Sequence, residues 1–260
     1  MKKYLLVFLC VVLMLQGISV KAESKTKVSI SSTSYNEQTG TWDFTIQSNS
    51  NKKIYYTYSN EHLDKKCKYV YDGDKISVQA SLINTTYTTL KLFIFEKDKM
   101  IKMYYRINNI ANNVYAKDLL SLCYDIVDTN DSDYIKAKKL YTWIGENKLY
   151  KFEGNKNNVY NALYGKYCAC SGFARLYVDM CKLVGLKAEY ASEYIVDYKY
   201  TEWHAWVHLY LDGNIYLVDP TWSGVCFNNE VNYSHFCNNS VVNYVVTEKY
   251  DLSSKNIYEQ

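Results

Sequence analysis

The stretch GKYCACSGFA, residues 165–174, decides how the C-terminal half of this chain is interpreted. Apolar residues then recur at helical spacing, and Gly185 supplies the expected stop. The pattern places Cys170 at or near the N-terminus of a helix, where unpaired N–H groups and the helix dipole favour negative charge. A thiol in that position is favoured as the thiolate, the form that attacks carbonyl carbons. Whether Cys170 is a nucleophile therefore depends on finding a base elsewhere in the chain.

The first 22 residues have the features of a secretory signal peptide. Lys2 and Lys3 precede an apolar run that is too short to span a bilayer comfortably. Val20 and Ala22 are small residues at the two positions that a signal peptidase reads. We expect cleavage after Ala22 and a secreted or cell-surface location, with a retained N-terminal anchor as the lesser alternative. No later segment is long and apolar enough to cross a membrane.

The formal net charge of +3 comes entirely from three lysines within these first 22 residues. Without them, the remaining 238 residues carry 27 basic and 27 acidic side chains. A formally neutral chain gives no electrostatic reason to expect binding to nucleic acid or to an anionic membrane. The composition therefore indicates a neutral exported protein.

The cysteines do not form a dense disulfide framework. Seven remain after residue 22, an odd number that leaves at least one thiol free or paired between chains. Cys226 and Cys237 are a candidate disulfide across a polar loop, and a chain of this length has no need of more. One unpaired thiol is what a cysteine enzyme requires.

Residues 27–108 are rich in Val, Ile, Thr, Tyr and Phe, in segments separated by polar turns such as Asp72-Gly73. This pattern predicts a small antiparallel β-sandwich of six or seven strands, with an immunoglobulin-like arrangement as one option. It contains no cluster of catalytic residue types, and its single histidine, His62, is interpreted as a surface or structural residue. The polar stretch NNIANN, residues 108–113, predicts the domain boundary. We therefore expect a sandwich domain over residues 23–112.

Residues 113–260 predict an α+β domain in which helices come first and an antiparallel sheet follows. Helices are expected at 115–127, 132–147 (with Ser132 as N-cap) and 159–164, ahead of the helix that begins near Cys170. Strands are expected at 188–196, 203–211 and 215–218. Asp212-Gly213 joins the last two strands and is a strong hairpin signal.

This hairpin supplies a candidate base and a candidate orienting group for the thiol. Antiparallel pairing about the turn joins residues whose numbers sum to about 425, so His204 is expected close to Asp219. The two side chains meet if they share a face or if a bulge adjusts them. A helix N-terminus packed there would complete a Cys170–His204–Asp219 triad, in which the imidazole takes the thiol proton and the carboxylate fixes the imidazole.

Three motifs in this order resemble the core motifs of the bacterial transglutaminase-like superfamily: Cys170-Ser171-Gly172-Phe173-Ala174, His204-Ala205-Trp206 and Asp219-Pro220-Thr221-Trp222. Residues 141–150 and 244–252 also look like that family, so the resemblance covers roughly residues 130–252 and none of the predicted sandwich. Cys168 departs from the family pattern where glycine is usual, and Val207 departs where asparagine is frequent. Neither is a triad position.

The resemblance implies a papain-like α+β core that runs acyl transfer through a thioester. Cys170 would attack an amide carbonyl of a protein or peptide, His204 would protonate the departing amine, and Asp219 would hold the His204 tautomer. The backbone N–H of Cys170 would be the first oxyanion donor, and Trp143 or Tyr150 is a guess for the second. Release to water gives hydrolysis and release to an amine gives glutamine crosslinking, which the sequence does not separate. No cofactor or metal is expected, and the sequence leaves the oligomeric state open.

Other interpretations of the same residues remain open. Taken singly, Cys170 would be a buried small hydrophobe, and His204 and Asp219 would be structural residues; three such coincidences are needed together. Cys168 is a rival nucleophile, a redox partner, half of a disulfide or an incidental thiol. Zinc bound by the two cysteines with His204 or His208 lacks standard ligand spacing. The alternative to an enzyme is an inactive surface-binding or adhesion module. Three tryptophans are interpreted as core and cleft wall: Trp203, Trp206 and Trp222.

Overall fold

The computed structural model describes residues 26–58, 63–83, 88–96, 99–196, 201–224 and 230–238. Several sequence-based expectations lie outside these ranges: the signal peptide, His62, Cys226 with its candidate disulfide, and the family-like segment 244–252. Within these ranges, no helix combines the length and the apolarity needed to span a membrane.

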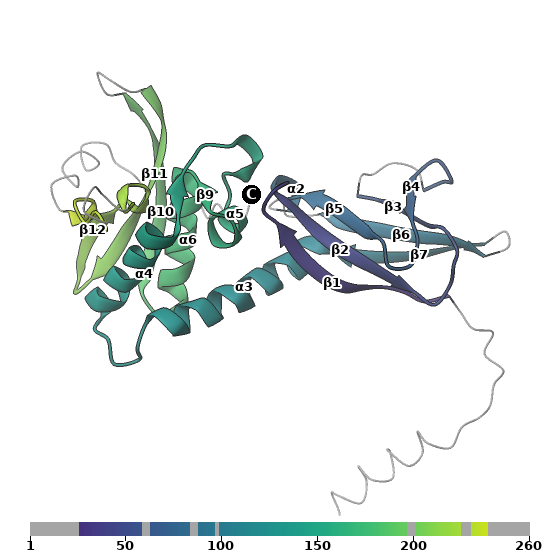
Figure 1. The fold of residues 1–260 in the computed structure, drawn as a ribbon, viewed down its shortest axis with the longest axis horizontal. Coiled ribbons are helices and arrows are strands. Elements are labelled where there is room, and N and C mark those ends of the chain that lie inside the picture. The colour runs from purple at the N-terminus through teal and green to yellow at the C-terminus, as the bar shows by residue number, and fades with distance from the viewer. Residues whose placement is uncertain are drawn as a thin grey trace, which may run out of the picture.

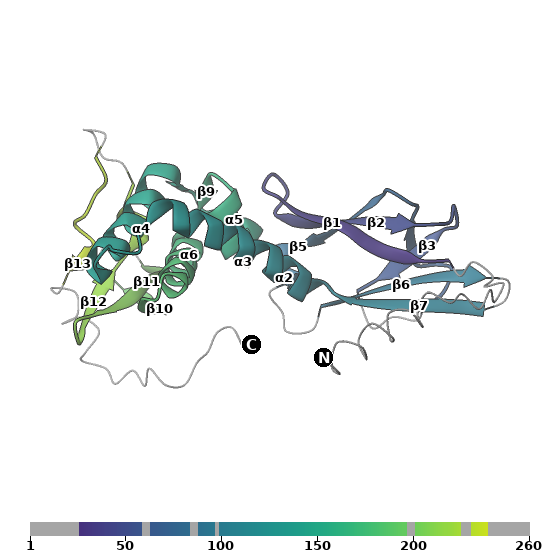
Figure 2. The same cartoon turned by 90° about the horizontal axis from the view of Figure 1, so that it is seen from below.

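Two antiparallel sheets form the N-terminal part of the molecule (Figures 1 and 2). One sheet has the order β1 (Val28–Asn36), β2 (Thr41–Ser48), β5 (Lys75–Gln79). The other has the order β4 (Lys68–Val70), β3 (Ile54–Thr57), β6 (Thr89–Glu96), β7 (Lys99–Arg106), and a short helix α2 (Ala80–Ile83) follows β5. Apolar side chains of both sheets form the core, because alternate residues of each strand point to the same face. The largest of them are fully buried: Trp42, Phe44, Ile46, Ile54, Ile76, Leu90, Leu92 and Ile94.

Helix α3 (Ile107–Ile126) begins directly after β7 and runs for 20 residues. The polar stretch at 108–113, predicted as the domain boundary, is helical, and the expected helix start at residue 115 is wrong. Buried side chains recur every four residues along one face: Ile107, Ala111, Tyr115, Leu119 and Cys123. The packing of this stripe outweighs the weak helix propensity of the asparagines between them. Figure 1 shows α3 leading from the sheets to the helices, while the division of the chain at residue 112 stays a prediction.

The C-terminal part contains helices followed by an antiparallel sheet, which confirms the α+β class. The helical segments are α4 (Asp133–Asn147), η1 (Gly154–Lys156), α5 (Val159–Tyr164), α6 (Cys170–Leu183) and the later η2 (Pro220–Trp222). The sheet has the order β10 (Lys187–Val196), β11 (Thr201–Leu211), β12 (Asn214–Val218), β13 (Phe236–Asn238). Two short parallel strands, β8 (Leu149–Tyr150) and β9 (Tyr167–Cys168), pair just before α6. Helix α6 packs against α4, α5 and the strands β10 and β11, so its first residue lies beside the sheet.

An aromatic cluster joins the first sheet to α5; we call it the aromatic junction and define it as Tyr35, Trp42, Tyr160 and Tyr164. The Trp42 ring meets the Tyr160 ring edge-on at 5.1 Å between centroids, and Tyr35 stacks on Tyr164 at 5.5 Å. The Tyr35 hydroxyl donates to Oδ1 of Asn161 at 3.3 Å. Such contacts bury large rings and add edge-to-face attraction, so the junction holds the first sheet against the segment that leads into the cysteine loop.

Candidate active site

Cys170 is the first residue of α6, as the sequence predicts. Its N-cap, Ala169, has no side chain that caps the helix, and the Cys170 side chain is half-buried. The N–H groups of the first helical turn have no intrahelical acceptors, so they point toward whatever lies ahead of the helix. The thiol therefore stands where the helix can stabilise negative charge on sulfur or on a nearby oxygen.

His204 and Asp219 meet across the hairpin that carries them. The β11–β12 register pairs Val207 with Val218 and His208 with Leu217, which is the pairing predicted from the Asp212-Gly213 turn. His204 Nε2 lies 2.6 Å from Oδ2 of Asp219. The other carboxylate oxygen, Oδ1, accepts the backbone N–H of Thr221 at 3.0 Å. Asp219 is thus buried with both oxygens in hydrogen bonds, and it fixes the imidazole ring.

The thiol of Cys170 belongs to the same series of contacts. Burial, the largest single influence, lowers the pKa of His204, but hydrogen bonds to Asp219 and to Cys170 raise it, to about 10 overall. Because Nε2 faces Asp219, Nδ1 is the ring nitrogen left for the thiol. The three predicted residues are therefore brought together in the order thiol, imidazole, carboxylate, and the imidazole is held as a cation at neutral pH.

Cys168 does not share this environment. Its side chain is buried, and Sγ lies 3.7 Å from the carbonyl oxygen of Asn158 and 3.8 Å from that of Lys156. Burial raises the pKa of the Cys168 thiol to about 12. A Cβ atom added at Gly172 would overlap this sulfur, so the thiol fills the space that the glycine leaves. Of the two cysteines in the loop, Cys168 is a packing residue, which removes the main rival nucleophile.

A cleft of about 570 Å³ opens in front of the thiol. Among the residues that the structure describes, its lining holds no lysine, arginine, aspartate or glutamate, and aromatic rings dominate it. Two of these rings are unusually open to solvent: Trp203 is 69% exposed and Phe152 is 68% exposed. The lining consists of Tyr150, Phe152, Asn157, Cys170, Ser171, Tyr190, Ser192, Trp203, His204 and Ala205.

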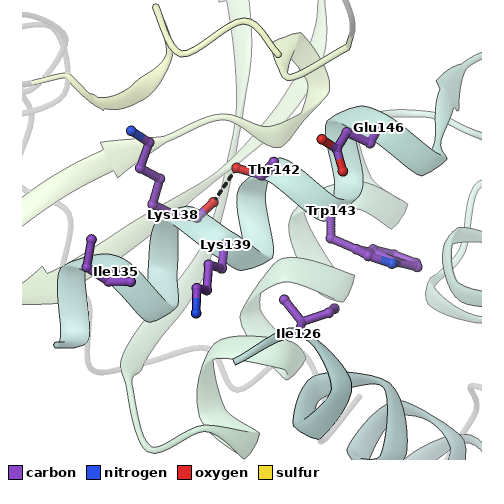
Figure 3. A pocket seen from close by; sticks show the side chains of 7 residues that line it. All are labelled: Ile126, Ile135, Lys138, Lys139, Thr142, Trp143 and Glu146. Atoms are coloured by element: carbon purple, nitrogen blue, oxygen red, sulfur yellow. Dashed lines mark hydrogen bonds between the residues drawn. The ribbon is translucent and has the colours of Figure 1, made fainter. Parts of the chain in front are cut away.

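Two sequence-based guesses about the surroundings have different outcomes. Tyr150 lies in the cleft wall, whereas Trp143 lines a separate pocket of about 400 Å³ between α3 and α4 (Figure 3). Trp143 is therefore the wrong choice for a second oxyanion donor. His208 also lies away from the cleft: Trp206 Nε1 donates to its Nε2 at 3.2 Å, and burial lowers its pKa.

Sequence reasoning missed several cleft residues that carry no motif of their own. Asn157 precedes the predicted helix at 159–164 and carries no motif, and Tyr190 and Ser192 are visible in the sequence only as part of the predicted strand at 188–196. Alternation along β10 offered a partial signal, because residues 188, 190 and 192 share one face of the strand. Nothing in the sequence signalled that Asn157 faces the cleft, because its placement depends on a hydrogen bond to Gly172, 15 positions later in the chain.

The fold and this site define an α+β protein in which a cysteine at a helix N-terminus faces a histidine–aspartate pair on an antiparallel sheet. Residues 121–220 match the model of the Transglutaminase-like superfamily, so the chain carries a domain of that superfamily.

Named relatives are distant. The mouse protein called Kyphoscoliosis peptidase is 25% identical over 137 residues, which cover 47% of this chain and 21% of that protein. The chain thus spans about a fifth of this relative's length. A crystal structure from Cytophaga hutchinsonii, described as that of a candidate cysteine protease, covers 45% of this chain and 40% of its own, at 24% identity and a TM-score of 0.37. A structure described as a TGase covers 51% of this chain and 37% of its own, at 16% identity and a TM-score of 0.37.

Proposed function

We propose that this protein is an exported cysteine enzyme that transfers an acyl group from a protein or peptide amide through a thioester on Cys170. The observation that carries the proposal is the series of contacts from Cys170 through His204 to Asp219. The partly buried imidazole of His204 is kept cationic by its hydrogen bonds to Asp219 and to the thiol of Cys170. That arrangement supplies a nucleophile and a proton donor at once.

The reaction has two halves. Cys170 attacks the amide carbonyl as a thiolate, a carbon–sulfur bond forms, and the carbonyl π pair moves to oxygen. When that pair returns, the carbon–nitrogen bond breaks and the amine leaves with the proton of His204. Water or a second amine, deprotonated by His204, then attacks the thioester and releases Cys170. Asp219 keeps Nε2 of His204 occupied throughout, so that Nδ1 always faces the sulfur.

The cleft lining supports a polypeptide substrate with uncharged residues beside the reacting amide. Apart from the Cys170–His204 pair itself, the described part of the lining holds no charged side chain to compensate a buried lysine, aspartate or similar group of the substrate. The exposed rings of Trp203 and Phe152 offer flat apolar faces that a bound segment would cover. We infer that neutral or apolar residues flank the amide that reacts.

Export is the part of this proposal that depends on the first 22 residues alone. N-terminal sequencing of protein recovered from the medium or the cell surface tests it. A mature chain that begins at Glu23 supports export, and full-length protein retained in the cytosol contradicts it.

Labelling with iodoacetamide at neutral pH tests whether the thiol is activated. We expect Cys170 to react faster than a free model thiol and His204→Ala to remove most of the difference. Cys168→Ser is the matched control, because it alters the other thiol of the same loop and is expected to leave labelling unchanged. If Cys170 reacts no faster than the model thiol and His204→Ala changes nothing, the chain is a binding module and the exposed aromatic rings are its contact surface.

A second assay separates hydrolysis from transamidation. A glutamine-containing protein is incubated with the enzyme and a fluorescent amine, with Cys170→Ala as the blank. Fluorescence incorporated into the protein supports crosslinking chemistry, because an amine then resolves the thioester. New peptide termini without incorporation support a peptidase.

A further inference from the structure

Asn157 lies between the N-terminus of α6 and the cleft. Its Oδ1 accepts the backbone N–H of Gly172 at 3.2 Å, and the thiol of Cys168 lies 3.8 Å from the same oxygen. Ala169 has no side chain to cap this helix, so Asn157 provides the cap from the segment that follows η1. The side chain is thereby fixed to the helix that begins with Cys170.

The hydrogen bonds of Oδ1 also determine which way the amide faces. A backbone N–H and a thiol are both donors, so the atom they meet must be the oxygen, and Nδ2 occupies the opposite end. Nδ2 makes no hydrogen bond with any part of the chain that the structure describes. The same side chain lines the cleft together with Cys170 and His204. Two N–H donors of one amide are therefore available to a bound ligand.

We propose that Nδ2 of Asn157 is the second oxyanion donor of the acyl-transfer reaction, alongside the backbone N–H of Cys170. This assignment rests on the proposed function. As the carbon–sulfur bond forms and the π pair moves to oxygen, these two N–H groups hold the negative charge. They release it when the carbon–nitrogen bond breaks and the amine departs with the proton from His204.

The placement suits this role because the donor and the nucleophile move together. Asn157 is bonded to the third residue of α6 and Cys170 is the first, so a shift of the helix carries both. Donors that are already oriented before the reaction need no reorganisation when charge develops. Tyr150, the other polar group considered for this role, has a ring that is 53% exposed. It lies on β8, whose backbone pairs with β9 ahead of the helix, whereas the side chain of Asn157 is bonded to α6 itself.

Two substitutions at the same position separate the cap from the oxyanion donor. Asn157→Asp keeps an oxygen that accepts the Gly172 N–H, and its charge suits a helix N-terminus, but it replaces both Nδ2 donors with an acceptor. Asn157→Ala removes the cap and the donors without adding charge. If Nδ2 binds the oxyanion, kcat falls about 10²- to 10³-fold in both variants. Asn130→Asp, on the exposed turn before α4, is the control for the same chemical change elsewhere.

The rate of Cys170 alkylation by iodoacetamide separates the two roles of Asn157. A purely structural role would change this rate, whereas loss of an oxyanion donor would not. This reaction displaces iodide and forms no oxyanion, so its plateau rate at high pH should stay within about twofold of wild type in Asn157→Asp, with an unchanged unfolding midpoint. Loss of kcat in Asn157→Ala alone would show that only the cap matters and would overturn the assignment. Loss in Asn157→Asp alone would attribute the effect to charge and would overturn it equally. A wild-type protein without any acyl transfer would overturn the proposed function and this assignment together, whereas an active Asn157→Asp variant would overturn the assignment alone.

Discussion

Two groups of aromatic side chains lie on either side of the cysteine loop, in opposite environments. In the aromatic junction, Trp42 is fully buried and Tyr160 is 2% exposed, each ring packed edge-on against the other. In the cleft, Phe152 and Trp203 leave two thirds of their surface in solvent beside a thiol. The residue types are alike, so their hydrophobicity does not decide which group stabilises the fold. Strands β1 and β2, more than 100 positions earlier in the sequence than α5, pack Tyr35 and Trp42 onto it, whereas they contribute no residue to the described cleft lining.

The largest effect is expected from emptying the junction. Trp42→Ala should lower the free energy of unfolding by about 3–5 kcal/mol, because it removes a fully buried ring and leaves a cavity. Trp42→Phe is the control: the indole Nε1 has no hydrogen-bond partner within the described ranges, so loss of its N–H should cost little. Denaturant unfolding measures both. Equal stability of the alanine variant and the wild type would mean that the junction does not hold the molecule together.

Two titratable side chains, Lys148 beside the end of α5 and His204 in the cleft, should make opposite contributions to the pH dependence of stability. Burial lowers the pKa of Lys148, whose Nζ donates to the carbonyl oxygens of Leu163 and Gly165 at the end of α5, from 10.5 to about 8. The unfolded chain therefore binds more protons than the folded one above pH 8, and stability from this group rises toward pH 10.5. His204 acts the other way: its pKa is raised from 6.5 to about 10, so its contribution is complete below pH 6.5 and is lost as pH rises through 10.

Substitutions separate these two opposing contributions to the pH dependence of stability. Each contribution changes the free energy of unfolding by at most about 1.4 kcal/mol per pH unit. Relative to wild type, Lys148→Met should lose a contribution that rises between pH 8 and 10.5, so its stability should fall more steeply with pH there. Relative to wild type, His204→Gln should lose a contribution that falls between pH 6.5 and 10, so its stability should fall less steeply with pH there. Unfolding curves across this range measure both variants, and parallel profiles for the two would contradict the assignment.

Truncating the cleft rings should change substrate binding without changing the fold. Under the proposed function, Trp203→Ala or Phe152→Ala should raise KM for a peptide substrate about tenfold, equivalent to roughly 1.4 kcal/mol of contact. The free energy of unfolding should stay within about 0.5 kcal/mol, because the rings are exposed. Tyr124→Ala, which removes a ring on α3 that is 67% exposed and outside the cleft lining, is the matched control. An equal effect of all three would show that the cleft rings have no special role.

The smallest effect is expected from a single hydroxyl of the junction. Tyr35→Phe removes the bond to Asn161 Oδ1 and should cost about 0.5–1.5 kcal/mol. Burial raises the pKa of Tyr35 to about 12, so the hydroxyl is a donor throughout the physiological range. Thermal unfolding of the two proteins, compared at one pH, measures the difference. A gain in stability would show that the hydroxyl is not well satisfied at the junction.

The sequence correctly predicted the elements that are determined by residues close together in the chain, such as turns, strand register and helix N-termini. The Asp212-Gly213 turn fixes the β11–β12 register, and that register brings His204 to Asp219. Ser132 accepts the N–H of Ile135 as the predicted N-cap of α4, because capping involves residues only three positions apart. The same holds for the first residue of α6.

Features that depend on distant contacts were not predictable in this way. Helix α3 starts eight residues early because its asparagines lie between positions buried by other segments. Asn157 is held at the site by its hydrogen bond to Gly172 of α6, and Trp143 lies outside the cleft lining because its face of α4 turns toward α3. Neither placement produces a periodic pattern. The distinction between the two loop thiols was also only partly visible, since it depends on the sulfur of Cys168 filling the space above Gly172.

The uninterrupted run from β7 into α3 makes the length of that helix a constraint of its own. An α-helix turns by about 100° and advances by about 1.5 Å for each residue. A single residue inserted or deleted in the middle of α3 would therefore rotate everything after it by that angle relative to the two sheets. Tyr35 and Trp42 would then no longer face Tyr160 and Tyr164. The length of α3 therefore sets the rotation of the segments that follow it relative to the two sheets. Insertions or deletions in α3 should be tolerated far less well than substitutions on its exposed face.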